Sequence, residues 1–139
     1  AEAVATAVGE RGTRAILLTH GHDDHIRAAR ATADLLGAPL FLNPADRMLW
    51  DAVYDEAPDA EIADGDVYGV AGIELTAKHT PGHSPGSTYF AAPALGAVFT
   101  GDTLFQGGPG ATGRSYSSFE TIIDSIRRTL LTLPEETIV

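Results

Sequence analysis

One short segment, Thr19–His25, carries the side chains in this sequence that are best suited to metal chemistry. It reads THGHDDH, so His20, His22 and His25 lie within six positions of one another. Imidazole nitrogens and carboxylate oxygens are the ligands that zinc and similar divalent metals prefer. His20 and His22 alternate, so both side chains lie on one side of an extended segment. Asp24 and His25 follow at the turn that opens the next helix, and this spacing predicts two metal ions rather than one.

Two later clusters offer the remaining ligands that a two-metal site needs. His83 lies in a turn rich in proline and glycine (79–86, HTPGHSPG), and Asp102 follows Gly101 at the end of an apolar run. A carboxylate has two oxygens, so Asp102 can bridge two cations. His79 is expected to face solvent or to form a hydrogen bond behind the site rather than bind a metal.

Two further motifs resemble known sites without meeting their requirements. Gly82–Gly86 matches the Gly-x-Ser-x-Gly pattern of serine hydrolases, but Pro85 lacks the N–H that the oxyanion hole needs there. Gly108–Ser115 resembles a phosphate-binding loop, but Arg114 replaces the lysine and Pro109 removes an amide donor. A nucleotide site is therefore not expected. This loop is either a plain flexible connection or a place where Arg114 binds an anionic part of a substrate.

The apolar pattern predicts the elements that would position these clusters. Strands are expected at Ala15–Thr19 and Leu40–Leu42, with a helix over His25–Leu36 between them as a crossover. The other expected elements are helices over Ala1–Val8 and Pro44–Val53, an exposed acidic loop at Tyr54–Asp64, and short antiparallel strands at Val67–Val70, Ile73–Lys78, Ser87–Ala91 and Ala97–Thr100. The expected class is α/β (α+β), with a mixed sheet and outer helices.

The C-terminal part reads as a helix followed by the start of a strand. Ser117–Glu120 is interpreted as a capping box that begins a helix reaching Pro134, with Ile122 and Ile126 on its buried face. Thr137–Val139 reads as the first residues of a further strand. The polar clusters are expected at one edge of the sheet.

Three motifs, in this order along the chain, resemble the metallo-β-lactamase superfamily, and the second and third are similar to its glyoxalase II-like branch. They are His20-x-His22-x-Asp24-His25, Thr80-Pro81-Gly82-His83-Ser84 and Gly101-Asp102-Thr103-Leu104-Phe105. The resemblance covers Ala15–Pro134. It implies that residues 1–139 form a single, truncated domain with a partial αβ/βα sandwich, and that the metal site lies at the edge between two sheets.

The same resemblance implies a ligand set. Metal 1 would take His20, His22 and His83, metal 2 would take Asp24 and His25, and Asp102 would bridge the two metals. Two zinc ions are expected, with iron or manganese as alternatives. Family members have several strands before the first motif and a further histidine that completes metal 2. The sequence therefore reads as a fragment in which metal 2 lacks its last histidine.

Composition limits the partners and the compartment. The formal charge of −10 disfavours contact with nucleic acid. There is no cysteine and no apolar run long enough to span a membrane. These features fit a cytoplasmic protein with a small-molecule substrate and no membrane partner. An exposed half-sheet could pair with another chain, so a homo-oligomer is left open.

The resemblance implies a metal-dependent hydrolase of small thioesters, of the S-2-hydroxyacyl-thiol type found in glyoxalase II. Metal-activated hydroxide would attack the thioester carbonyl, and Asp24 would share protons as well as hold metal 2. Three alternatives stay open: a persulfide dioxygenase with one iron, a lactonase, and a metal-binding module without catalysis.

Overall fold

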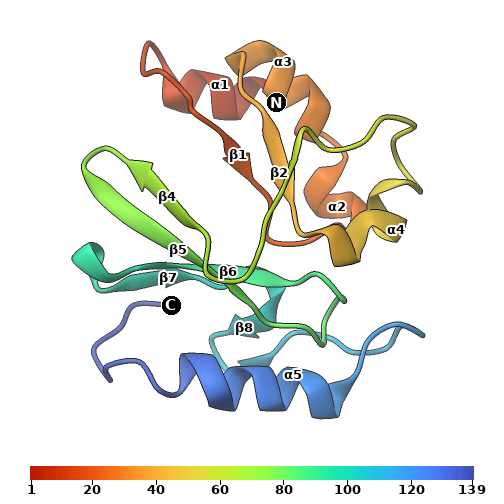
Figure 1. Ribbon diagram of the computed structural model, residues 1–139, viewed down its shortest axis with the longest axis vertical. Coiled ribbons are helices and arrows are strands. Elements are labelled where there is room, and N and C mark those ends of the chain that lie inside the picture. Colours follow the sequence, from red (N-terminus) through yellow and green to blue (C-terminus); the bar gives the residue numbers. More distant parts are fainter.

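The computed structural model describes residues 1–139 and arranges them as helices, a parallel sheet, an antiparallel sheet and a final helix (Figure 1). The strands are β1 Ile16–Leu17, β2 Leu40–Leu42, β3 Ala60–Glu61, β4 Val67–Val70, β5 Ile73–His79, β6 Thr88–Ala92, β7 Ala97–Phe99, β8 Leu104–Phe105 and β9 Gly108–Pro109. The α-helices are α1 Glu2–Val8, α2 Asp23–Ile26, α3 Ala29–Leu36, α4 Arg47–Trp50 and α5 Phe119–Ser125. The predicted mixed α/β class is confirmed.

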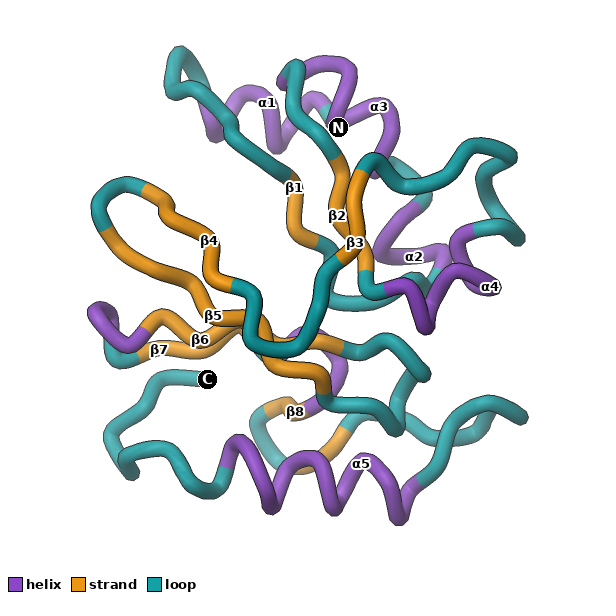
Figure 2. The backbone as a smooth tube through the Cα atoms, in the orientation of Figure 1, coloured by secondary structure: helices purple, strands orange, loops and turns teal.

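The N-terminal half consists of the parallel sheet β1-β2-β3 and helices α1 to α4, as Figure 2 shows. The predicted strand–helix–strand unit is confirmed, but the single helix predicted over His25–Leu36 is wrong. The chain forms α2 and α3 with a break at Ala28, where φ is −100° and ψ is 4°. The Tyr54 hydroxyl donates to the carbonyls of Ile26 and Arg27 at 2.7 and 2.9 Å. In a continuous helix those carbonyls would accept hydrogen bonds from backbone N–H groups one turn later. The Tyr54 side chain therefore accounts for the break between α2 and α3.

The helix predicted over Pro44–Val53 is confirmed only in its first part. A 3₁₀ turn, η1 (Pro44–Asp46), leads into α4, which ends at Trp50. The Asn43 side chain accepts a hydrogen bond from the Ala45 N–H at 3.0 Å, as an N-cap residue does.

The exposed loop predicted for Tyr54–Asp64 is wrong in its second half. This segment contains β3, which pairs in parallel with β2, and Ile62 directly after it is fully buried. Asp59 accepts a hydrogen bond from the Leu40 N–H at 2.7 Å and pairs with Arg30 at 2.9 Å. These contacts hold an acidic segment against the sheet. The polarity of the segment alone predicts an exposed loop and does not reveal them.

The C-terminal half is the antiparallel sheet β4-β5-β6-β7 with α5 on its outer face (Figure 1). The predicted meander is confirmed. Ile122 and Ile126 are buried against this sheet, and a π-helical segment, η4 (Ile126–Leu130), continues α5. Ile138 forms an isolated parallel bridge with Ala97, so the strand predicted at Thr137–Val139 is confirmed at one residue.

The cap of α5 differs from the predicted one by one position. Ser118 is the N-cap residue, and its hydroxyl accepts from the Thr121 N–H at 3.2 Å. Glu120 therefore stands at the second helical position instead of the third that a capping box requires. The Ser117 hydroxyl instead bonds the backbone of Arg114.

Three apolar clusters hold the layers together. One lies between the parallel sheet and its helices around Trp50, one lies between the antiparallel sheet and α5 around Ile122, and one lies between the sheets around Phe90. A hydrogen bond of 2.8 Å from the Thr88 N–H to the Thr19 carbonyl also links the two sheets. The loop after β1 therefore lies next to β6. No helix in the structure is long and apolar enough to cross a membrane.

Candidate metal centre

Five side chains from separate parts of the chain converge where the two halves meet. His20 and His22 follow β1, and His25 lies in α2. His83 comes from the β5–β6 loop, and Asp102 lies in η3 (Gly101–Thr103) after β7. Their donor atoms form two groups, His20–His22–His83 and His20–His25–Asp102, and within each group the atoms lie within 4.8 Å of one another. Each group offers three ligands, which suits a metal that keeps a further position open.

The two most buried histidines present free nitrogens to this centre. His83 donates from Nδ1 to the Ala111 carbonyl at 2.7 Å, and His20 Nδ1 lies 3.2 Å from the Thr19 hydroxyl. The opposite nitrogens, Nε2 of His20 and of His83, are buried without a hydrogen-bond partner. A buried polar atom without a partner is costly, and a cation at this position would satisfy both. The residues present therefore fit a divalent metal.

Asp102 lies between the two donor groups. Its Oδ1 is 3.4 Å from His25 Nε2, and its Oδ2 is 3.5 Å from His83 Nε2. Gly101 has a φ of 52°, and an added Cβ would lie 2.6 Å from the Thr19 Cβ. Only glycine allows this close approach, which brings Asp102 up to the loop after β1.

Asp24 is not part of either donor group. Its side chain is 75% exposed, and its Oδ2 lies 3.9 Å from His25 Nε2 at the start of α2. The neighbouring Asp23 pairs with Arg27 on the surface. His79 donates from Nε2 to the Pro85 carbonyl at 2.7 Å, which confirms the prediction that it hydrogen-bonds outside the ligand set.

Arg114 is exposed on a loop and is not one of the metal donors. Its backbone is fixed by the Ser117 hydroxyl, which bonds both its N–H and its carbonyl. The pKa of His22 is lowered, mainly by burial and further by the positive charges of His83 and Arg114. The carboxylates of Asp46 and Asp24 act in the opposite direction and raise it in part. Arg114 therefore adds positive potential to the side of the centre where His22 lies.

Asp46 is a functional residue that the sequence did not reveal. It is fully buried at the end of η1 and accepts hydrogen bonds from the Gly21 N–H (2.8 Å), the Gly86 N–H (2.5 Å) and the Ser84 hydroxyl (2.7 Å). Gly21 separates two of the histidines, and Ser84 follows His83. One carboxylate thus holds both histidine loops in place. In the sequence, Asp46 has the ordinary appearance of an acidic residue in a first helical turn.

Tyr116 is a second residue that sequence reasoning missed. Its hydroxyl lies 2.8 Å from Nε2 of His22, although the two residues are 94 positions apart. Tyr116 stands in a serine-rich loop with no motif around it, so no local signal pointed to it.

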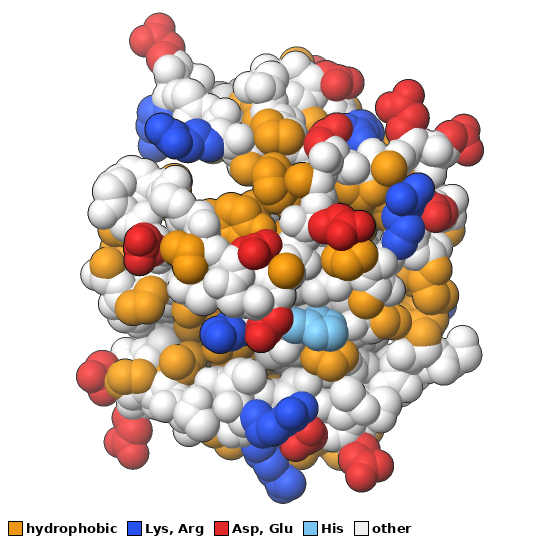
Figure 3. Space-filling view, viewed as in Figure 1, with side chains coloured by type: hydrophobic (Ala, Val, Ile, Leu, Met, Phe, Trp, Pro, Cys, Tyr) orange, Lys and Arg blue, Asp and Glu red, His pale blue; other side chains and the backbone are white.

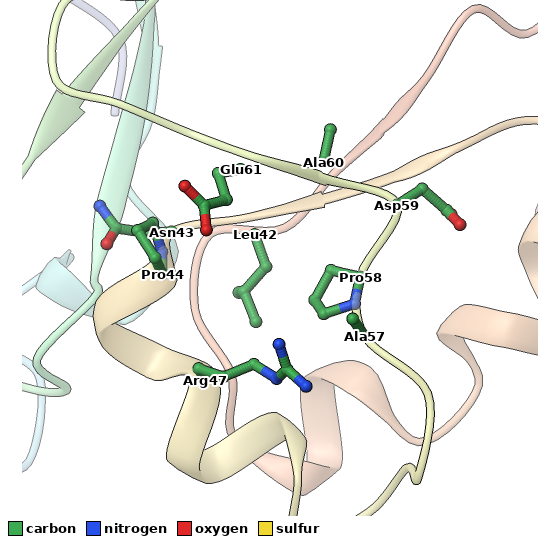
Figure 4. Close-up of a pocket in the computed structure, with 9 residues that line it drawn as sticks. All are labelled: Leu42, Asn43, Pro44, Arg47, Ala57, Pro58, Asp59, Ala60 and Glu61. Carbon is green, nitrogen blue, oxygen red and sulfur yellow. The ribbon is translucent and has the colours of Figure 1, made fainter.

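A separate hollow of about 390 Å³ lies outside the metal centre. Its nine lining residues come from β2, α4 and β3 and the segments beside them (Figure 4). Leu42 and Pro58 form part of its apolar wall, and the Arg47 guanidinium lies below Leu42 (Figure 4). Arg47 pairs with Asp51. None of the metal donors lines this hollow.

The metal-free protein is expected to lose stability as the pH is lowered from about 6.5. Burial, followed by the charge of His25 and of its other histidine neighbours, lowers the pKa of His20 from 6.5 to about 3. The unfolded chain therefore takes up a proton in this range that the folded chain does not, so acid favours unfolding. The slope reaches about 1.4 kcal/mol per pH unit for this proton. Urea unfolding of the chelator-treated protein at several pH values measures it.

A His20→Ala variant is the comparison for that experiment. Between pH 6.5 and the range where carboxylates titrate, at about pH 4, its unfolding free energy should depend less steeply on pH than that of the unaltered protein. Equal slopes in the two proteins would exclude His20 as the cause.

The sequence also matches a known family over almost its whole length. The family model described as the metallo-beta-lactamase superfamily matches residues 2–139. Together with the fold and the histidine–aspartate centre, this match shows that the chain belongs to the metallo-β-lactamase superfamily, whose members are metal-dependent hydrolases.

Curated relatives are similar to the chain without agreeing on an activity. An uncharacterized protein of Mycobacterium tuberculosis is 37% identical over 148 residues, which cover 90% of this chain and 66% of the relative. A protein named hydroxyacylglutathione hydrolase GloC in Haemophilus influenzae is 34% identical, covering 91% and 66%. A probable metallo-hydrolase of Bacillus subtilis, YqgX, is 36% identical, covering 90% and 65%. The chain thus spans about two thirds of the length of these relatives.

Solved structures have the same fold. The BLEG-1 B3 metallo-beta-lactamase superposes with a TM-score of 0.87 at 29% identity, covering 98% of this chain and 73% of that one. TTHA1623 in a di-iron-bound form gives 0.82 at 30% identity, covering 96% and 72%. ETHE1 from Myxococcus xanthus gives 0.77 at 27% identity, covering 98% and 55%. The metal-bound neighbour and the donor groups of this chain together support a divalent metal site.

Proposed function

We propose that this protein is a metal-dependent hydrolase of small thioesters of the S-2-hydroxyacyl-thiol type. The observation that carries the proposal is the pair of donor groups joined by His20, with one Asp102 oxygen beside each of His25 and His83. Such a centre suits two zinc ions. A divalent cation bound there would supply water of lowered pKa as the nucleophile and would polarise the substrate carbonyl. The similarity to a protein named hydroxyacylglutathione hydrolase supports the same substrate class.

The side chains around the centre favour a substrate with a good leaving group. The hydroxyls of Ser84 and Thr103 are buried and bonded to Asp46 and Thr80 respectively, so neither is available as a general acid. A thiolate needs little protonation when it leaves, because the pKa of its thiol is about 8.5. Asp24, exposed beside His25, is the side chain that we assign to exchanging protons with solvent.

Arg114 is the residue that we assign to the anionic part of the substrate. It is exposed, its loop is anchored beside the centre, and its charge is felt at His22. On the face in Figure 3, Lys and Arg side chains (blue) lie in several separate places, some next to acidic side chains (red), and do not form one large basic patch. This arrangement, with a net charge of −10, disfavours nucleic acid as a partner. The substrate that we propose is a small molecule in the cytoplasm.

An Arg114→Ala variant is expected to raise KM for an anionic thioester about 10- to 100-fold and to leave kcat nearly unchanged. One charge-assisted contact is worth about 1.5 to 3 kcal/mol, and losing a contact made equally in the bound state and the transition state affects KM alone. Steady-state hydrolysis of S-lactoyl thioesters measures both constants. Arg127→Ala, which removes an exposed arginine on the outer helix, is the matched control and should leave both unchanged.

Metal content and substrate choice separate this proposal from its alternatives. About two zinc ions per chain with thioester turnover would support it. Oxygen uptake with a thiol persulfide and about one iron per chain would favour the dioxygenase, whose iron would be held by His83, by Asp102 and by either His20 or His22. Faster hydrolysis of lactones than of thioesters would indicate a lactonase. Bound metal without any turnover would indicate a non-catalytic module.

A further inference from the structure

The segment 110–118 crosses the metal centre and is fixed at both ends by the loops that carry the ligands. At its first end, an added Cβ on Gly110 would lie 1.8 Å from the Asp102 carbonyl oxygen, so only glycine fits against that loop. At its other end, the Ser118 N–H donates to the Gly82 carbonyl at 2.9 Å, one residue before His83. The position of this segment is therefore set by the loops that carry Asp102 and His83.

Two residues of the segment bond the outward nitrogens of metal-donor histidines. The Ala111 carbonyl accepts from Nδ1 of His83 at 2.7 Å, which fixes the tautomer of that ring and leaves its Nε2 free. The Tyr116 hydroxyl lies 2.8 Å from Nε2 of His22. In both contacts an oxygen atom of the segment bonds one ring nitrogen of a histidine. For His83 this nitrogen is Nδ1 and the partner is a backbone carbonyl, whereas for His22 it is Nε2 and the partner is a side-chain hydroxyl.

We propose that Tyr116 is a positioning residue that holds His22 with its hydrogen on Nε2 and its Nδ1 lone pair directed at the first donor group. An imidazole that binds a metal through one nitrogen carries its hydrogen on the other. Because the Tyr116 hydroxyl occupies Nε2 of His22, Nδ1 is the nitrogen left for the metal. This inference depends on the metal centre and not on the substrate, so it goes beyond the proposed function.

His22 depends on such a contact more than the other two histidines of its group. His20 and His83 are 1% and 7% exposed and are held by the surrounding protein, whereas His22 is only partly buried. Tyr116 is in turn held by its neighbours, because the hydroxyl of Ser117 bonds the backbone of Arg114 on one side and Ser118 is anchored on the other. Its hydroxyl therefore restrains a ring that the protein interior encloses only in part.

A Tyr116→Phe variant tests the role by removing only the hydroxyl. We expect its dissociation constant for zinc, measured by competition with a chromophoric chelator, to rise about 10- to 100-fold, as for other residues that orient a metal ligand. Tyr68→Phe is the matched control. Tyr68 lies on β4, and its hydroxyl donates to Asp66 at 3.2 Å and bonds no metal donor. That variant should bind zinc as the unaltered protein does.

The tautomer of His22 provides a readout that loss of general stability would not produce. Nitrogen-15 NMR of the metal-free, unaltered protein at neutral pH should show the hydrogen of His22 on Nε2, and the Tyr116→Phe protein should show a mixture of both forms. The hydrogen on Nδ1 in the unaltered protein, or zinc binding within twofold of normal in Tyr116→Phe, would overturn the proposal. Neither measurement involves turnover, so both outcomes are independent of whether thioesters are the substrate.

Discussion

Replacing Asp46 with alanine is expected to lower the free energy of unfolding by about 3 to 5 kcal/mol. The carboxylate is fully buried and accepts hydrogen bonds from the Gly21 N–H, the Gly86 N–H and the Ser84 hydroxyl. Each donor left without a partner in the interior costs about 1 to 3 kcal/mol, and a small domain is stable by only about 5 to 15 kcal/mol in total. Urea or guanidinium unfolding followed by circular dichroism measures the loss.

Asp51→Ala is the control for that measurement. Asp51 follows α4 and pairs with Arg47 on the surface, where an ion pair contributes about 0.5 kcal/mol or less. The two variants remove the same side chain five residues apart, so their difference isolates burial and hydrogen bonding. A loss of less than about 1 kcal/mol in Asp46→Ala would contradict the role that we assign to this carboxylate.

The double variant His20→Ala/His22→Ala is expected to lose zinc binding and at least about 100-fold in thioester turnover while it remains folded. The two residues supply two of the three nitrogens in the first donor group, and His20 belongs to the second group as well. Loss of a residue that merely orients a ligand costs about 10- to 100-fold, so loss of two ligands should cost more. Elemental analysis, turnover and circular dichroism on one preparation separate the three effects.

His79→Ala is the matched control for the double variant. It removes a histidine from the end of β5 that bonds the Pro85 carbonyl and belongs to neither donor group. This variant should keep its metal and its activity. Turnover retained in the double variant would show that catalysis takes place without these ligands and would refute the site.

Sequence reasoning predicted the structure most reliably where the evidence lies in a short stretch of the chain. The apolar run before His20 and the alternating strands of the meander are local features, and the strands formed where expected. The resemblance of three motifs to a known family implied that His20, His22 and His83 bind one metal, and their donor atoms do lie together in the structure. Asp24 was assigned to the metals by the same reasoning, and its 75% exposed side chain lies outside both donor groups.

The sequence was less informative where a distant side chain decides the outcome. Tyr54 ends α2 through two backbone carbonyls, and Asp59 draws an acidic segment onto the sheet as β3. Asp46 and Tyr116 act on the histidine loops through residues that are 25 to 94 positions away. Hydrogen bonds between residues this far apart leave no periodicity or motif, so a single sequence carries no sign of them.

The division of the ligands between the two halves has a consequence for the order of folding. Neither donor group is complete within one half, since the first needs His83 and the second needs Asp102, both from the C-terminal half. Contacts within each half are closer in the chain and can form early, whereas the contacts between the halves close long loops. A cation should therefore bind the docked state in preference to its precursors and slow the separation of the halves.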